Sequence, residues 1–461
     1  MERDTRKPNR GFVLVVVFVS TQGQPMLVLL LALAPSLLAQ DEVERTAKAA
    51  LARVQAVELR RTVEDLVGFG TRHIASAIDD PAAGTGAART YLERRMREAG
   101  APAGDRLVVE RKSYPVSARR IGKDVAAVNI VATLRGVSDP DRLYVIGGHY
   151  DSINGDNRDA SGRAPGANDD GSGTALVLEA LRALAPLPLA ATVVFVCYDG
   201  EEMGLLGSTE HAKELAAADA KVDGMITNDI VGNTLGMDGV RRTDYLRAFS
   251  YAPRGNDTTG RSLARAATFA AKRHVDGFEV RMVLRGDRYG RGGDHRPFFT
   301  EGFPAIRLTE PREDFSRQHA TLTTREGKPY GDLPEFVDAD YLANVCRTNV
   351  ALLVELASAP PPPLTVRARG ARTSYDTIVS FAPIEGAAAY ELVWRLTTAA
   401  DWEGARLLGA DDITRERGQL AATLVGVCLD DCVVGVRCVA KDGARSRVTA
   451  PPEPDAFESR R

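Results

Sequence analysis

Two short stretches of this sequence combine histidine with aspartate, residue types that hold divalent metal ions. His149 and Asp151 stand two residues apart in GGHYDS, and residues at this spacing on a strand share a face. A histidine beside a capping aspartate would explain that pair equally well. Further on, Asp169 and Asp170 are adjacent in GANDDGSG, just before a helical pattern. One aspartate is enough to cap a helix, so the second indicates another use, such as metal binding.

Two further acidic stretches and a second histidine extend this set of candidate metal ligands. Glu201 and Glu202 directly follow an apolar run, where neighbouring carboxylates repel each other and lose hydration unless a cation lies among them. Asp229 stands between apolar neighbours in MITNDIVGN, and His319 stands in the polar segment FSRQHATLTT. The candidate ligands are His149, Asp169, Glu202, Asp229 and His319. Five ligands are too many for one open tetrahedral zinc ion but suit two zinc ions that share a bridging carboxylate, which leaves Glu201 free to act as a general base.

The elements that must position these residues follow a strand–helix–strand order. The runs AAVNIVATLRG, RLYVIGGHYD and LAATVVFVCYDGEE predict strands, and GTALVLEALRALA between the last two predicts a helix. Apolar residues at helical spacing over residues 42–65 and 84–99 predict further helices. This order predicts an α/β fold with a largely parallel sheet, at whose strand ends functional groups gather.

A change of composition near residue 359 predicts a second domain. Four consecutive prolines, Pro360 to Pro363, indicate a stiff linker over residues 359–364. Short alternating runs over residues 365–450 predict a small all-β sandwich, whose aromatic and turn placement resembles a fibronectin type III module. Residues 451–461 are expected to form a disordered tail. Three of the five cysteines fall in this part, and in an exported protein two of them could form a disulfide: Cys428, Cys432 and Cys438.

The N-terminus carries the signals of export. MLVLLLALAPSLLAQD, from Met26, is an apolar run that ends in small residues, which predicts a signal peptide over residues 1–39 with cleavage near Ala39, or a true start at Met26. A membrane anchor built from both N-terminal apolar runs is the alternative. We therefore expect an exported protein, periplasmic or extracellular, without a stable membrane span after cleavage. The net charge of -3 argues against a nucleic-acid partner.

Taken in order, these motifs resemble those of the M28 family of di-zinc aminopeptidases, over about residues 60–355. The resemblance implies a mixed, largely parallel sheet sandwiched by helices, the zinc exopeptidase fold, in a domain of residues 40–358. It implies two zinc ions bridged by Asp169, with His149 and Asp229 completing one site and Glu202 and His319 the other. It also implies that Asp151 orients His149.

The substrate pocket is expected to lie beside these ligands. His295, in GGDHRPFF, competes with His319 for the last ligand position. The family usually has a segment of this kind before GFPAI and a separate histidine in a later loop, so the resemblance favours His319, although Gln318-His319-Ala320-Thr321 departs from the family's commoner Tyr-His-Thr form. His295, Asp294 and Arg291 are then expected to line the pocket, where the basic loop around Arg291 would face an acidic group. His211 and His274 are expected at the surface.

The resemblance implies a secreted zinc-dependent aminopeptidase that removes N-terminal residues from peptides with a free N-terminus. A metal-activated water would attack the peptide, with Glu201 as the general base. A carboxypeptidase-like or glutaminyl-cyclase-like enzyme of the same fold, a non-catalytic exported binding protein and a calcium-stabilised adhesion protein are the alternatives.

Overall fold

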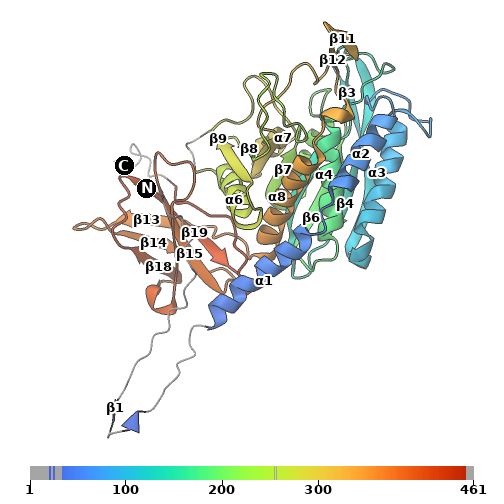
Figure 1. The fold of residues 1–461 in the computed structure, drawn as a ribbon. Coiled ribbons are helices and arrows are strands. Elements are labelled where there is room, and N and C mark those ends of the chain that lie inside the picture. The colour runs from blue at the N-terminus through green and yellow to red at the C-terminus, as the bar shows by residue number, and fades with distance from the viewer. Residues whose placement is uncertain (1–19, 22–23, 26–33, 254, 256, 453–461) are drawn as a thin grey trace.

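An eight-stranded sheet occupies the centre of the first part of the chain, and two smaller sheets form the second part (Figure 1). The computed structural model describes residues 20–21, 24–25, 34–253, 255 and 257–452, so most of the predicted signal peptide lies outside the described residues. Ala39, the predicted cleavage position, falls within the first helix, α1 (Ala34–Leu51). No helix in the described part of the chain is long and apolar enough to cross a membrane.

The large sheet is mixed and mostly parallel, as predicted. Four of its neighbouring strand pairs are parallel and three are antiparallel. In spatial order the strands are β3 (Leu107–Ala118), β4 (Lys123–Leu134), β6 (Ala191–Tyr198), β5 (Asp139–His149), β7 (Lys221–Asn228), β10 (Ala305–Thr309), β8 (Tyr245–Phe249) and β9 (Glu279–Val283). The three predicted strands correspond to β4, β5 and β6.

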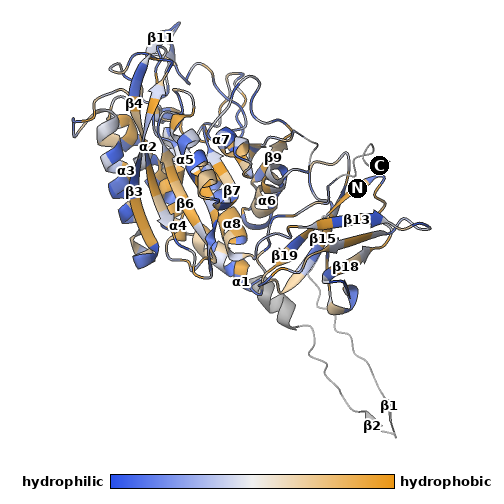
Figure 2. Ribbon diagram, turned by 180° about the vertical axis from the view of Figure 1, so that it is seen from behind, coloured by the Kyte–Doolittle hydropathy of each residue, from blue (hydrophilic) through white to orange (hydrophobic). Residues whose placement is uncertain are grey.

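Helices cover both faces of this sheet, because its central strands are apolar on both sides. Every residue of β6 is buried; Phe195 packs in the core on one face, and Val194 and Val196 pack in the core on the other. Figure 2 shows this apolar centre between the helices. One core includes α1, α2 (Ala56–Gly68), α3 (Gly84–Gly100), α4 (Gly171–Leu184), α6 (Thr259–His274) and α8 (Ala339–Ser358). The other includes α5 (Leu206–Ala217) and α7 (His295–Thr300).

Two sequence expectations in these helices are wrong. The periodic stretch 42–65 forms two helices, α1 and α2, separated at residues 52–55, where the backbone N–H of Gln55 is bonded to Glu179 of α4. His211 is buried and the side chain of His274 is only 5% exposed, because their helices turn these side chains toward neighbouring elements. His211 packs against Tyr198 and Phe298, and His274 lies 2.7 Å from a carboxylate oxygen of Glu355 in α8.

After α8 the chain builds two antiparallel sheets that share a separate apolar core, here called the C-terminal sandwich. One sheet contains β13 (Val366–Gly370), β14 (Thr377–Phe381), β18 (Gln419–Leu424) and β17 (Thr414–Glu416), and the other contains β16 (Gly404–Leu407), β15 (Ala389–Leu396) and β19 (Cys432–Val439). All five cysteines are free thiols, so the disulfide considered for this part is not formed. The fibronectin type III resemblance and the domain limits stay predictions.

The remaining elements are short. They are the strand pairs β1 (Ser20–Thr21) with β2 (Gln24–Pro25) and β11 (Thr323–Arg325) with β12 (Lys328–Tyr330), and the 3₁₀ helices at Ala101–Arg106, Pro334–Phe336 and Ala410–Asp412.

The C-terminal sandwich docks on the first part through a hydrogen bond to the buried Glu355 and an ion pair with Asp223. Glu355, near the end of α8, accepts hydrogen bonds from Arg273 of α6 and from the backbone N–H of Arg445. Asp223 of β7 pairs with Arg447 at 2.6 Å. Because these contacts join segments far apart in the sequence, they fix the sandwich against α6 and α8.

Candidate metal centre

The predicted ligands meet where three parallel strands end. His149 is the last residue of β5, Glu202 follows β6, and Asp229 directly follows β7. Since β5 lies between β6 and β7 and runs parallel to both, all three chain segments leave the sheet at the same edge. Asp169 reaches this edge from the loop before α4. The strand order therefore brings together residues that are up to eighty positions apart in the sequence.

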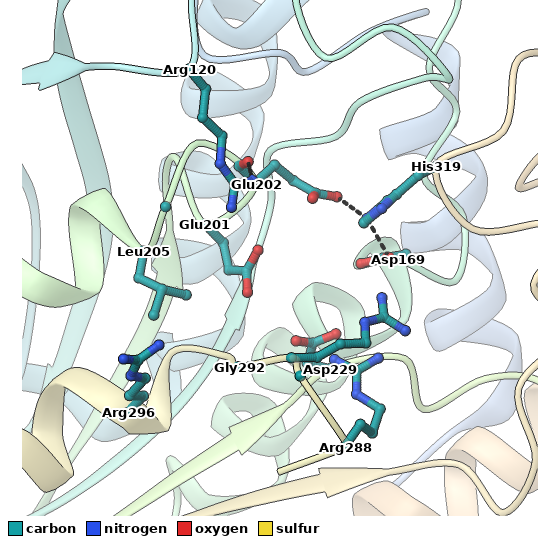
Figure 3. A pocket seen from close by; sticks show the side chains of 13 residues that line it. Arg120, Asp169, Glu201, Glu202, Leu205, Asp229, Arg288, Gly292, Arg296 and His319 are labelled. Atoms are coloured by element: carbon teal, nitrogen blue, oxygen red, sulfur yellow. Dashed lines mark hydrogen bonds and ion pairs between the residues drawn. The ribbon is translucent and has the colours of Figure 1, made fainter.

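Asp169 lies between two histidines and faces each of them with a different oxygen. Its Oδ1 is 3.2 Å from Nε2 of His149, and its Oδ2 is 3.0 Å from Nε2 of His319. Each histidine also has a second carboxylate beside it. Nε2 of His149 is 3.9 Å from Oδ1 of Asp229, and Nε2 of His319 is 2.9 Å from Oε1 of Glu202. Figure 3 shows His319 between Glu202 and Asp169.

These separations suit zinc ligands. Nitrogen and oxygen atoms about 2.1 Å from a tetrahedral zinc ion lie roughly 3.4 Å from each other, and the four measured distances fall on both sides of that value. Two groups of possible ligand atoms lie within 4.8 Å of one another: His149 with Asp169 and Glu202, and His149 with Glu201 and Asp229. The donor set, imidazole nitrogen and carboxylate oxygen, fits two zinc ions. Glu201 is also within reach of a metal, so its separate role as a base stays a prediction.

Asp151 lies behind the candidate ligands and connects His149 with the segment that contains Glu201 and Glu202. Its carboxylate accepts hydrogen bonds from the backbone N–H groups of Glu201 at 3.1 Å and Glu202 at 3.2 Å. The same carboxylate is 3.4 Å from Nδ1 of His149, the ring nitrogen that faces away from Asp169. Asp151 is therefore placed to orient both His149 and the acidic segment after β6, as expected of a residue that supports metal ligands.

Asp170 and Asp332 hold the loop that carries Asp169. Asp170 caps α4 by accepting a hydrogen bond from the backbone N–H of Gly173, and it also accepts one from the backbone of His149 at 3.0 Å. Asp332 accepts hydrogen bonds from the backbone N–H groups of Asn168 and Asp169. The role of Asp332 was missed by sequence reasoning, because no nearby motif distinguishes it from other loop aspartates.

Arg307 of β10 orients Asp229. Its Nη1 lies 2.8 Å from Oδ2 of Asp229 and 3.5 Å from Asp287. The other oxygen of Asp229, Oδ1, is buried and has no hydrogen-bond partner among the described residues. An unpartnered buried carboxylate oxygen is costly, and here it faces His149 within the candidate metal group. This orphaned oxygen is an independent sign that the site fits a cation.

The pKa values of the acidic residues differ according to their neighbours. Burial raises the pKa of Glu201, and the negative charges of Asp229 and Glu202 raise it further, so that it lies well above its usual range despite nearby His149. Burial also acts on Asp229, but Arg307 and His149 outweigh it and lower the pKa of Asp229 to about 2. Glu201 therefore holds a proton more readily than Asp229.

A cavity of about 580 Å³ opens above these residues, and Arg291 is among the residues that line it. Asp294 and His295, also expected there, are fully buried and do not line this cavity. His295 stacks on Tyr251 and its Nε2 lies 2.9 Å from the carbonyl oxygen of Gly286. His319, not His295, therefore contacts Asp169 and Glu202.

Three other arginines line the cavity: Arg288, which belongs to the basic loop expected at the pocket, and Arg120 and Arg296, which were not predicted. Arg120 comes from the turn between β3 and β4, far from any of the motifs. Arg288 and Arg296 flank the predicted Arg291 in the sequence. The high arginine content of that segment pointed to Arg288 and was the only signal that could have pointed to Arg296.

Known proteins share the sequence and the fold of this chain. The sequence profile described as peptidase family M28 matches residues 129–331. A probable zinc metalloprotease of Pyricularia oryzae is 40% identical over 429 residues, which are 88% of this chain and 84% of the relative. One of Leptosphaeria maculans is 37% identical over 428 residues, 88% of this chain and 97% of the relative.

Two solved structures from Legionella pneumophila share the fold at 20% identity. LapB has a TM-score of 0.53 over 68% of this chain and 74% of its own. The LapA aminopeptidase has a TM-score of 0.50 over 68% of this chain and 75% of its own. These likenesses concern the peptidase fold.

Proposed function

The chain belongs to peptidase family M28 as a zinc metalloprotease, and we propose that it is an exported aminopeptidase that removes residues from the free N-terminus of peptides. The observation that carries the proposal is the placement of Asp169, whose two oxygens face two histidines that each have a further carboxylate beside them. A bridging carboxylate of this kind is the mark of a paired metal site.

The chain's own residues would hold the two zinc ions as follows. Asp169 would bridge them, His149 and Asp229 would bind one, and Glu202 and His319 would bind the other. When bound, zinc lowers the pKa of a coordinated water and polarises the scissile carbonyl. Asp151 would keep the imidazole of His149 in place through Nδ1, and Arg307 would keep one oxygen of Asp229 directed at the site.

Glu201 would move the proton. Its carboxylate lines the cavity beside the candidate ligands, and its raised pKa brings it closer to working pH, where an acid–base catalyst is most effective. It would accept a proton from the attacking water and return that proton to the leaving amine. The hydrogen bond from its backbone N–H to Asp151 fixes where it stands relative to His149.

Two observations support the finer parts of the proposal. Four carboxylates line the cavity beside the two histidines, Asp169, Glu201, Glu202 and Asp229, which supports a catalytic site built around two divalent cations. The motif resemblance implies that the free α-amino group of the substrate docks near the metals, and LapA of Legionella pneumophila, which shares the fold, is an aminopeptidase. The apolar run from Met26 supports export.

A panel of paired peptides tests this function, each supplied with a free and with an acetylated N-terminus. We expect hydrolysis of the free forms only, its loss with a chelator, its return with zinc, and two zinc ions per chain by elemental analysis. Release of C-terminal residues from acetylated peptides would instead indicate a carboxypeptidase. Pyroglutamate formation with one zinc per chain would indicate a cyclase.

A further inference from the structure

The cavity above the candidate metal centre is rich in arginine and poor in apolar side chains. Arg120, Arg288, Arg291 and Arg296 line it, whereas Leu205 is the single apolar side chain among its described lining residues. Figure 3 shows Arg120, Arg288 and Arg296 entering from three different directions around Glu201. A pocket for a large apolar side chain would be lined mainly by apolar groups. This cavity is therefore suited to a polar or charged part of the substrate.

The balance of charges in the cavity indicates whether the bound part of the substrate is positive or negative. Four carboxylates and four arginines line the cavity. Two divalent cations would carry as much positive charge as the four carboxylates carry negative charge, so metal binding leaves the arginines without compensation from the cavity wall. Since guanidinium groups stay protonated in proteins, the loaded cavity would be strongly positive and would attract an anionic group.

Acidic residues outside the cavity wall balance only part of this charge. Nη1 of Arg288 and Nη1 of Arg291 each lie 3.0 Å from Oε2 of Glu313, and Arg247 lies 3.1 Å from its other oxygen. Three arginines thus share one glutamate, although Arg288 also contacts Asp287 at 3.2 Å. The side chain of Arg291 is 32% exposed, so it retains free donors that face the cavity.

Arg296 has the least compensation of the four. It is exposed, and its guanidinium group forms no ion pair or hydrogen bond with any residue in the described part of the chain. Arg120 donates only to the backbone carbonyl of Glu202. A planar guanidinium group with free N–H donors binds a carboxylate through two parallel hydrogen bonds.

We propose that Arg296, with Arg288 and Arg291, binds a carboxylate of the substrate next to the scissile peptide bond. The proposal rests on the proposed peptidase function and narrows its substrate class to peptides that carry an acidic group at this position. In a short peptide the carboxylate could come from an acidic first residue, an acidic second residue or the C-terminus. All three present the same group to the arginines, so they are separated by experiment.

Three pairs of dipeptides that differ only by carboxylate and amide test the proposal. They are Glu-Leu-amide with Gln-Leu-amide, Leu-Glu-amide with Leu-Gln-amide, and Leu-Leu with Leu-Leu-amide. With the zinc-loaded full chain we expect kcat/KM at least about tenfold higher for the carboxylate member of one pair, as for a charged hydrogen bond. The pair that shows the preference identifies the source of the carboxylate.

Arg296→Gln should reduce this preference to less than about threefold. Arg285→Gln is the matched control, because Arg285 is exposed in the same segment, stacks on Tyr289 and does not line the cavity. It removes the same charge and should leave the preference unchanged. A preference that survives Arg296→Gln, or that falls equally in both variants, would overturn the assignment.

Failure of this proposal is distinguishable from failure of the peptidase function. Chelator-sensitive hydrolysis with equal rates within all three pairs would overturn the carboxylate site and leave the peptidase. If no peptide is cleaved, the aminopeptidase function fails, and calorimetric titration of the same dipeptides into the zinc-loaded chain decides. Tighter binding of a carboxylate member that is lost in Arg296→Gln supports the site, whereas equal or undetectable binding overturns it.

Discussion

Two clusters of buried charge in this molecule are built in opposite ways. Where the C-terminal sandwich meets α6 and α8, Glu355 is surrounded by donors from Arg273, His274 and the backbone of Arg445. At the candidate metal centre four carboxylates lie together, and among the described residues only Asp229 has an arginine within ion-pair distance. The first cluster is balanced by the chain itself, and the second is not.

The pKa values of Glu355 and Glu201, one glutamate from each cluster, differ in the same way. Burial would raise the pKa of Glu355, but His274 and Arg273 outweigh it and lower it below its usual value. At Glu201, burial and neighbouring carboxylates act in the same direction and raise the pKa. Ionised Glu355 therefore stabilises the fold, whereas ionised Glu201 opposes it. A group that costs stability and stays in place is typical of a functional site.

The largest expected effect comes from neutralising Glu201. Glu201→Gln should lower kcat by roughly 100- to 10,000-fold, because the general base is lost, while the five candidate ligands remain. Rates of peptide hydrolysis measure the loss of catalysis, and the zinc content measures whether the ligands still bind metal. Glu98→Gln, at an exposed position of α3, is the control. An active Glu201→Gln enzyme would exclude the proposed role.

Neutralising Glu355 should instead affect stability. Glu355→Gln should lower the free energy of unfolding by about 3 kcal/mol, because it leaves Arg273 and His274 buried without their anion. The matched control is Glu44→Gln, which contacts the same Arg273 at 3.2 Å from an exposed position and should cost less than about 1 kcal/mol. Urea unfolding measures both variants. Equal effects would mean that burial does not distinguish the two pairs.

In the metal-free chain the same Glu201→Gln change should increase stability. Removing a carboxylate whose ionised form is disfavoured should raise the free energy of unfolding by about 1 kcal/mol at neutral pH. Zinc should then stabilise the wild-type chain strongly, since a ligand that binds only the folded state adds stability by mass action. Melting temperatures of the wild type and of Glu201→Gln, each measured with chelator and with zinc, check both expectations. A metal-free variant less stable than the wild type would show that Glu201 has a structural partner.

The smallest expected effect is the pH dependence of the contribution that Glu355 makes to the free energy of unfolding. The pKa of Glu355 is lowered from an unfolded value near 4.5, so its contribution is fully present above that pH and is lost as pH falls through the folded value. The difference in unfolding free energy between wild type and Glu355→Gln should therefore be constant near neutrality and shrink below about pH 4.5. If the difference in unfolding free energy instead grows on acidification, the pKa of Glu355 is raised in the folded chain rather than lowered.

The sequence sufficed for those parts of the site that depend on strand order. Apolar runs ending in His149 and before Glu201 identify adjacent parallel strands, and the ends of such strands must lie at one edge. The arginines were harder to predict because Arg120 and Arg296 reach the cavity from separate loops. The burial of His274 depends on how α6 packs on α8 and on the sandwich. Such contacts between distant segments leave no local pattern.

The docking of the C-terminal sandwich has a consequence for how the molecule unfolds. Arg445 and Arg447 belong to the last described segment of the chain, yet the backbone N–H of Arg445 donates to Glu355 in α8 and the guanidinium group of Arg447 pairs with Asp223 in the central sheet. A cut at the prolines after α8 followed by loss of the sandwich would leave these two acids without those partners. The two parts are therefore expected to unfold in one cooperative transition. On this view the first part of the chain depends on the C-terminal sandwich for its stability.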